Sequence, residues 1–374
     1  MTQFSMRRLL ALVYKESLQV IRDPSTLMIA VILPLIMIFL FAFGVSLDLN
    51  KIRIGLVLED TSPEARSLAA AFQNTPYFSA TTETSRYKLT EELVAAKIRG
   101  IVVIPQDFTK NLKRGEIAPI QVIADGSETN TASFVQSYAE GVAALWWLSW
   151  QQEQGITELP SIISQVRVWF NAEIKSRNVI LPGSLAIIMA LIGTLLTALV
   201  VAREWERGTM EAILSTPVRI SEFIIGKMIP YFLLAMGSML FCIALAVFVF
   251  KVPFEGSILV LMLATAIFLL AALSQGLLIS IISKNQFVAS QAAINAAFLP
   301  AYMLSGFLYE IQTMPLPIRT LTYLFPPRYF VSIIQTSFLA GDVWALILPD
   351  MLAMLGLGSF FLMLVIKKSK KSLE

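Results

Sequence analysis

Histidine is absent from this chain of 374 residues, and cysteine occurs once, as Cys242. Without histidine the chain lacks the commonest general base and metal ligand, so neither a catalytic metal site nor a histidine-based triad is expected. A single cysteine forms no disulfide and no cysteine-based metal site within one chain. Cys242 lies inside an apolar run, and we interpret it as a small core residue.

Charged side chains are also scarce. They make up 15% of the chain, and 56% of the chain is hydrophobic, whereas soluble domains have about 25% charged and about 45–50% apolar residues. The composition therefore favours a multi-span membrane protein. The formal net charge is only +3, and the one dense basic cluster, at 367–371, directly follows an apolar run. That position is typical of a membrane anchor, so we expect the lipid bilayer as a partner and no nucleic acid.

A nucleotide-binding loop is missing as well. The P-loop has the pattern Gly-x-x-x-x-Gly-Lys-Ser/Thr, and the nearest match is Gly226-Lys227. There, Ser221 stands at the first glycine position and Met228 follows the lysine. Ion-driven carriers usually place ionisable groups near the membrane midplane, but Lys227 and Asp350 lie near the ends of their apolar runs. We therefore expect no enzymatic activity and no cofactor in this chain, and active transport would take its energy from another chain.

Six apolar runs are long enough to cross a bilayer of roughly 30 Å, which takes about 20 residues. The first run is too long for a signal peptide and no Ala-x-Ala-like site follows it, so we expect an uncleaved span. The sequence thus predicts an α-helical membrane protein with six transmembrane helices. The predicted spans are 27–47, 179–202, 223–250, 257–283, 286–308 and 345–366.

Lysine and arginine gather in the segments on one side of these spans, and the short loops on the other side carry few. The positive-inside rule makes the basic side cytoplasmic, so we expect both termini inside and a long external segment. The predicted domains are a cytoplasmic interface helix at 1–26, a first transmembrane helix at 27–47, a small extracytoplasmic α/β domain at 48–178, a bundle of five transmembrane helices at 179–366 and a basic cytoplasmic tail at 367–374.

Residues 6–22 precede the first span. Their apolar side chains, among them Leu9, Val13 and Ile21, recur at near-helical spacing opposite basic residues. This pattern predicts an amphipathic helix at the inner membrane surface. The alternative is a plain positively charged flank.

The external segment has a different character. Three strand-like runs alternate with helical stretches, which indicates a small α/β layer. The expected strands are 51–58, 99–105 and 119–125, and the expected helices are 63–74, 89–98, 106–115 and 129–153.

Trp146, Trp147 and Trp150 cluster near the end of the last of these helices. Such a cluster usually packs against its own domain or lies at a membrane interface. The alternative is contact with an apolar ligand or a partner protein.

A dense block of charges at 203–219 separates two apolar runs. Opposite charges at i,i+3 and i,i+4 predict a helix over 203–211, which Ser215-Thr216-Pro217 ends. A short cytosolic helix with an apolar side and charged flanks suits docking into a groove on a partner. The alternative is a solvated loop with incidental ion pairs.

Three stretches carry a family resemblance. Residues 201–235 (VAREWERGTMEAILSTPVRISEFIIGKMIPYFLLA) and 298–342 (FLPAYMLSGFLYEIQTMPLPIRTLTYLFPPRYFVSIIQTSFLAGD) resemble the diagnostic loops of ABC-2 type transporter permeases. Residues 15–34 (KESLQVIRDPSTLMIAVILP) are similar to that family's entry helix and first span. The resemblance covers the chain, and in detail it is to permeases of bacterial multidrug exporters whose ATPase is a separate chain.

The resemblance implies an ATP-driven exporter permease in the bacterial inner membrane. An apolar, uncharged path through the spans suits a lipophilic substrate. Two permeases, identical or paralogous, would pair above two ABC ATPase subunits, which bind the ATP and Mg, and a periplasmic adaptor protein is a further candidate partner. The 309–343 segment would form short re-entrant helices. Helix 6–22 would help seat the coupling helix on the ATPase. The residues expected to couple to the ATPase are Arg203, Glu204, Glu206, Arg207, Gly208, Met210, Glu211, Ile213 and Leu214.

Neutral polar side chains within the predicted spans are candidates for lining a substrate path. They serve equally well as hydrogen-bonding contacts between helices, which we expect for at least half of them. These residues are Gln275, Gln286, Gln291 and Asn295. Two other functions stay open: an ion-coupled secondary antiporter, because neutral oxygens can bind Na⁺, and a non-transporting scaffold or sensor that uses 48–178 as a receptor domain.

Overall fold

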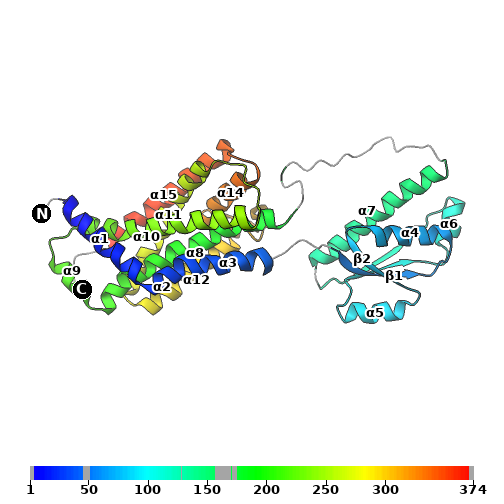
Figure 1. Cartoon of the computed structure of the whole chain (residues 1–374), viewed down its shortest axis with the longest axis horizontal. Helices are drawn as coiled ribbons and strands as arrows, with labels where there is room; N and C mark the ends of the chain where they lie inside the picture. The colour runs from blue at the N-terminus through cyan, green and yellow to red at the C-terminus, as the bar shows by residue number, and fades with distance from the viewer. Residues whose placement is uncertain (1–3, 45–50, 128, 156–169, 171–174, 370–374) are drawn as a thin grey trace. The chain divides into compact units, whose positions relative to one another are not determined.

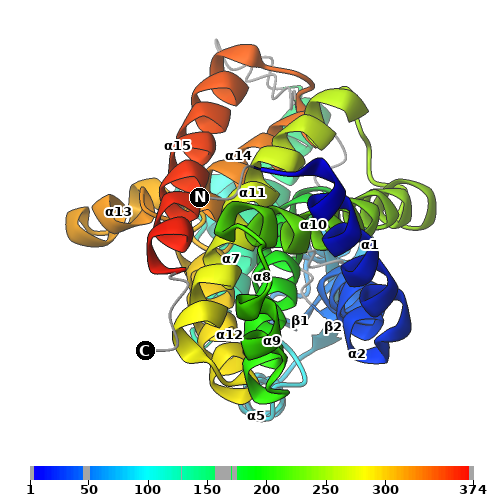
Figure 2. The same ribbon diagram turned by 90° about the vertical axis from the view of Figure 1, so that its left-hand side faces the viewer.

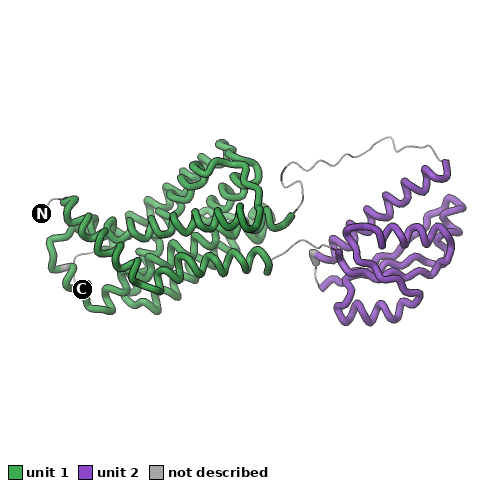
Figure 3. The backbone as a smooth tube through the Cα atoms, in the orientation of Figure 1, with its two compact units in different colours: residues 1–47, 168–374 green, residues 48–167 purple. Residues whose placement is uncertain are grey.

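The structure is a computed structural model that describes residues 4–44, 51–127, 129–155, 170 and 175–369. The chain divides into two compact units (Figure 3). A helical unit comprises residues 1–47 and 168–374, and an α/β unit comprises residues 48–167.

The helical unit contains the helices that the sequence assigns to the membrane. The described part of the first expected span is not a uniform α-helix. A π-helical turn lies on each side of its central α-helical segment, which contains Pro34. The elements are α1 (Met6–Arg22), α2 (Pro24–Leu27), η1 (Met28–Ile32), α3 (Leu33–Phe39), η2 (Leu40–Gly44), α8 (Arg177–Glu206), α9 (Thr209–Ser215), α10 (Ile220–Ala244), η3 (Leu245–Val249), α11 (Ile258–Ser283), α12 (Gln286–Met303), η4 (Ile311–Thr313), α13 (Leu316–Thr322), α14 (Pro326–Leu339) and α15 (Trp344–Lys368).

Five helical segments of the described chain are long and apolar enough to cross a membrane. They correspond to the first, second, third, fourth and sixth expected spans. The remaining one, 286–308, is helix α12, which has 18 residues and is not among the five. Its Gln286, Gln291 and Asn295 lower its hydropathy. A sixth crossing at α12 therefore stays a prediction.

Helix α8 is the centre of the helical unit. In its apolar window 89% of the residues are buried, against at most 50% in the other four segments. Small residues let α11 approach α8 closely: a Cβ on Gly276 would lie 2.1 Å from the carbonyl oxygen of Thr194. Thr197 Oγ1 donates to the Leu273 carbonyl across the same contact at 2.9 Å. Backbone contact of this kind is how helices associate inside a membrane.

The expected short helices of 309–343 are present as η4, α13 and α14. Helix α14 packs into the unit through buried apolar side chains, and its Phe330 ring stacks on Phe268 of α11 with centroids 4.2 Å apart.

The α/β unit holds a four-stranded sheet in the order β2-β1-β3-β4. Strands β1 (Ile52–Leu58), β2 (Phe78–Glu83) and β3 (Gly100–Ile104) are parallel, and β4 (Gln121–Ala124) runs antiparallel to β3. Strand β2 is absent from the sequence prediction. Its sequence, FSATTE, is polar and mostly exposed because it forms an edge of the sheet.

Helices cover both faces of the sheet (Figure 1). The helices are α4 (Pro63–Asn74), α5 (Arg86–Val94), α6 (Phe108–Arg114) and α7 (Thr129–Glu153). One face packs Ile54 and Leu56 of β1 with residues of α4 and α7. The opposite face packs Val57 and Ile101 against Leu89 of α5. The small α/β layer expected from the sequence is thus present, with one strand more.

Candidate functional site

The charged block between α8 and α10 is not one continuous helix. Helix α8 ends at Glu206, and Gly208 adopts the left-handed conformation (φ 68°) before α9 begins at Thr209. The Gly208 N–H donates to the Trp205 carbonyl at 3.1 Å. A glycine in this conformation is a common helix terminator, so the expected helix over 203–211 is wrong at Arg207–Gly208. The expected stop at Ser215 is confirmed.

Glu204, on the last turn of α8, points into the helical unit. It is only 4% exposed. One carboxylate oxygen accepts hydrogen bonds from Lys15 Nζ at 2.8 Å and Lys227 Nζ at 2.9 Å, and the other accepts from the Thr209 hydroxyl. Lys227 Nζ also lies 2.7 Å from Glu16 Oε1.

These four side chains, Lys15, Glu16, Glu204 and Lys227, form what we call the charge network. Glu16 and Lys227 are 1% and 2% exposed, and Lys15 also contacts Glu16 at 3.0 Å. Two carboxylates thus balance two ammonium groups. Glu16, Glu204 and Lys227 are buried, and the Lys15 side chain is about half exposed. Burial alone would lower the pKa of Lys15, but the neighbouring Glu204 and Glu16 carboxylates outweigh it and raise that pKa above its usual value.

The charge network joins three helices, since its members come from α1, α8 and α10. Helix α1 lies along α10 (Figure 2). The approach is close because Gly226 of α10 has no side chain: a Cβ there would lie 2.9 Å from Leu12 Cβ. The predicted amphipathic helix is therefore present, and part of it covers α10.

A second contact ties the end of α8 to the junction between α1 and α2. Arg203 Nη1 donates to Asp23 Oδ2 at 2.5 Å. Asp23 also caps α2, accepting from the Ser25 N–H and the Thr26 hydroxyl. Burial would raise the pKa of Asp23, but the hydrogen bonds from Thr26 and Arg203 hold it below its ordinary value. Arg203 itself is buried, at 7% exposure.

Glu222 makes a third contact, between the start of α10 and the start of α1. Its Oε1 accepts from Arg8 Nη2 at 2.9 Å and from the Ser5 N–H at 2.7 Å, and its Oε2 accepts from the Arg219 N–H at 2.8 Å. Helix α1 is therefore fixed at both ends and in the middle by charged groups.

The nine residues expected to couple to an ATPase divide into an inner and an outer set. The inner set comprises Arg203 and Glu204, which are buried, and Met210 and Ile213, which are half-buried against the helical unit. The side chain of Leu214 lies outside the described part of the structure. The exposed set is Glu206, Arg207, Gly208 and Glu211.

The four candidate path residues also divide. Gln275 Nε2 donates to the Ala296 carbonyl at 3.2 Å and so joins α11 to α12. Gln286, at the start of α12, donates its N–H to Glu206 at 2.8 Å. Gln291 and Asn295 are exposed on α12, one turn apart.

Sequence reasoning missed Glu16, Asp23 and Glu222, and it noted Lys227 without a role. Glu16 had a signal: it falls on the same helical stripe as Leu9, Val13 and Val20, at i,i+4,i+7,i+11 spacing. A carboxylate on the apolar face of a helix needs a buried partner. Lys227, the lone cation near the end of an apolar run, is that partner.

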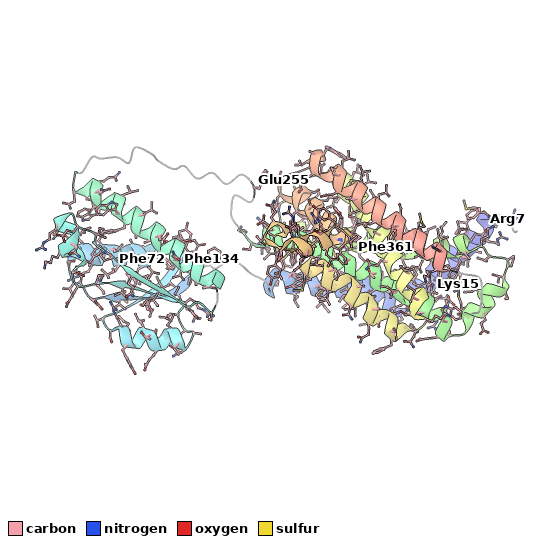
Figure 4. All side chains as sticks on the ribbon, turned by 180° about the vertical axis from the view of Figure 1, so that it is seen from behind. Arg7, Lys15, Phe72, Phe134, Glu255 and Phe361 are labelled. Atoms are coloured by element: carbon pink, nitrogen blue, oxygen red, sulfur yellow. The ribbon has the colours of Figure 1, made fainter. Side chains whose placement is uncertain are left out.

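The network and α9 lie at one end of the helical unit. Figure 4 shows Arg7 and Lys15 at this end and Glu255, in the connection between α10 and α11, at the opposite end. Glu206, Arg207, Gly208 and Glu211 thus form an exposed charged turn at the start of the short helix α9. Glu204, directly before this turn, joins α8 to α1 and α10 through the charge network.

Residues 24–367 match the model of a family described as ABC-2 family transporter protein. The probable multidrug ABC transporter permease YbhS of Escherichia coli (strain K12) is 47% identical over 371 residues, which cover 99% of this chain and 98% of that protein. The probable multidrug ABC transporter permease YbhR of the same organism is 28% identical over 338 residues, covering 89% and 90%. Its inner membrane transport permease YhhJ is 24% identical over 371 residues, covering 98% of each chain.

Proposed function

Because the chain belongs to the ABC-2 family of transporter proteins, we propose that it is the permease subunit of an ATP-driven exporter in the bacterial inner membrane. A separate ABC ATPase would bind ATP and Mg and supply the energy. The names of the relatives, probable multidrug ABC transporter permeases, support drugs as substrates. The near absence of charges from the apolar runs supports lipophilic ones. The absence of a P-loop in the sequence supports a separate ATPase.

One observation carries the mechanism: the charge network joins the base of the exposed turn to α1 and α10. In the proposal the ATPase contacts Glu206, Arg207 and Glu211, and its motion on ATP binding displaces α9. Rigid helices joined by buried, directional contacts move together rather than deform. The displacement would therefore reach α8, α10 and α1 at once, and through α8 the centre of the unit.

The charge network suits this role better than a purely stabilising one. Buried ion pairs are often no more stable than apolar packing of the same volume, although removal of one partner is costly. Here Glu16 Oε2 is buried and has no hydrogen-bond partner among the described residues. The sequence thus keeps a buried charged arrangement with an unsatisfied atom, and a role in fixing three helices in one register accounts for that.

The end of the helical unit that carries the charge network and α9 would face the cytoplasm. The chain would then cross the membrane six times, with both termini inside and the α/β unit outside. The basic residues at this end support that orientation through the positive-inside rule. The exposed Gln291 and Asn295 of α12 support a second permease as a partner, because amides facing lipid are costly. Between two copies, these side chains would border the substrate path. A periplasmic adaptor that binds the α/β unit completes the proposal.

Substitutions of Gly208 test the position of the coupling turn, by which we mean the exposed residues of 206–211 that would contact the ATPase. Proline is locked near φ −65° and has no N–H, so Gly208→Pro is incompatible with the φ of 68° and loses the bond to Trp205. We expect ATP-dependent transport to fall at least about tenfold, since α9 is displaced from its place. Accumulation of the chain should be unchanged, because a side chain at Gly208 would meet no atom within 4 Å.

Gly208→Asn is the matched control, because asparagine tolerates the left-handed conformation better than other residues with a side chain. It should transport within about twofold of the unmodified chain. Transport is measured in vesicles that contain equal amounts of the permease and its ATPase. Normal transport by Gly208→Pro would show that the coupling turn lies elsewhere.

A further inference from the structure

The α/β unit contains a pocket of about 290 Å³ between α4, α6 and α7. This volume is at the small end of the range of ligand sites, roughly 300–1,000 Å³. Its floor is made by Leu68 of α4 and Phe108 of α6, which are 1% and 3% exposed. Trp146 and Trp147 of α7 line it as well. The pocket is therefore a concave, mainly apolar site within one unit of the chain.

The aromatic wall of the pocket is held in place. Trp146 Nε1 donates to Ser67 Oγ at 3.1 Å, and its ring lies 5.8 Å from that of Phe108. Trp147 is 40% exposed, and its ring stacks on that of Trp150 with centroids 5.2 Å apart. Trp146 thus packs in its own domain, as the sequence predicts, and Trp147 stays partly exposed. Contact of the cluster with an apolar ligand or a partner protein stays a prediction.

Glu116 is the one charged residue among those that line the pocket. Gly115, in the left-handed conformation (φ 70°), ends α6, and Glu116 follows directly. The nearby Lys113 is paired with Glu64 at 2.7 Å and is not among the lining residues. Ile117 leaves an apolar side chain 88% exposed at the same pocket.

We propose that this pocket binds a small, flat aromatic cation. Indole faces attract cations through the ring quadrupole, apolar walls take up the aromatic body, and Glu116 supplies the opposite charge. A neutral molecule of the same shape would lack two of these three interactions, and an anion would meet the Glu116 carboxylate. The site is a property of the α/β unit, so it binds with or without ATP and does not depend on the proposed transport function.

Equilibrium dialysis of the full chain in lipid nanodiscs tests the site, with empty nanodiscs subtracted to remove partition into lipid. The probes are N-methylquinolinium and its uncharged isostere, methylnaphthalene. We expect saturable binding of the cation to one site in each chain, at least about fivefold tighter than the isostere. Glu116→Gln should weaken binding of the cation about tenfold and change binding of the isostere less than about twofold.

Two further variants separate the pocket from the rest of the unit. Ala143→Phe fills the pocket from a half-exposed position on α7 and should abolish binding of both probes. Glu91→Gln removes an exposed carboxylate on α5, across the sheet, and should change neither. Binding that is not saturable, that survives Ala143→Phe, or that is equally tight for both probes would overturn the proposal.

Discussion

Lys227→Met is expected to lower the melting temperature of the purified chain by on the order of 10 °C. Removing one member of a buried charge cluster costs about 3–5 kcal/mol, because the charges left behind lose their compensation. Here the carboxylates of Glu16 and Glu204 would stay buried with only the half-exposed Lys15 beside them. Thermal unfolding followed by the loss of monodisperse protein in detergent measures the effect.

The double variant Glu16→Gln/Lys227→Met should recover more than half of the loss. It removes one negative charge together with the positive one, and Glu204 keeps Lys15 at 2.8 Å. Lys368→Met, an exposed lysine at the end of α15, is the control for the loss of a positive charge and should melt like the unmodified chain. If Lys227→Met melted like this control, the charge network would have no structural role.

Gly276→Ala is expected to destabilise the helical unit by about 3 kcal/mol, the upper end of the usual cost of overpacking. The added Cβ would lie 2.1 Å from the Thr194 carbonyl oxygen and 2.3 Å from Thr197 Oγ1. The Thr194 oxygen is backbone and cannot rotate away, so α8 and α11 must separate. We expect aggregation on size-exclusion chromatography and loss of transport.

Gly356→Ala provides the comparison within another apolar helix. A Cβ there would meet no atom within 4 Å, and alanine favours the helix over glycine by up to about 1 kcal/mol. This variant should be as stable as the unmodified chain or slightly more so. Equal stability of the two variants would mean that α8 and α11 are not in the close contact described here.

Local patterns predicted most of the secondary structure because its periodicity is strong. The expected strands at 51–58, 99–105 and 119–125 are confirmed as β1, β3 and β4. Strand β2 was missed because its serines and threonines lie at an edge, where only pairing with β1 makes them a strand. For helix α12 the helical structure was expected and is present. Its amides lower its hydropathy, so its role as a membrane span stays a prediction.

The candidate site was predicted in position but not in contacts. The block at 203–219 was located by its charge, and local spacing then suggested ion pairs within it. The structure instead pairs Arg203 with Asp23 and Glu204 with Lys15 and Lys227. These partners are about 20 to 190 positions away in the sequence, and only the packing of α1, α8 and α10 brings them together. Spacing along one helix carries no information about such pairs.

The break at Gly208 had a sequence signal, a glycine directly after a charged helical turn. The run of alternating charges outweighed it in the prediction. With the break in place, the charged Glu206, Arg207 and Glu211 are exposed, and Met210 and Ile213 of the expected apolar side are half-buried. Contact of an ATPase with this turn is therefore expected to be mainly polar and to weaken with salt.

Transport in proteoliposomes tests the central claim most directly. The chain is reconstituted with its ATPase, or with an ATPase whose P-loop lysine is replaced, and accumulation of fluorescent lipophilic dyes is followed. We expect accumulation with ATP and the intact ATPase, none with the replaced lysine, and none from an ion gradient alone. Accumulation driven by an ion gradient in the absence of ATP would contradict it and would identify the protein as an ion-coupled antiporter.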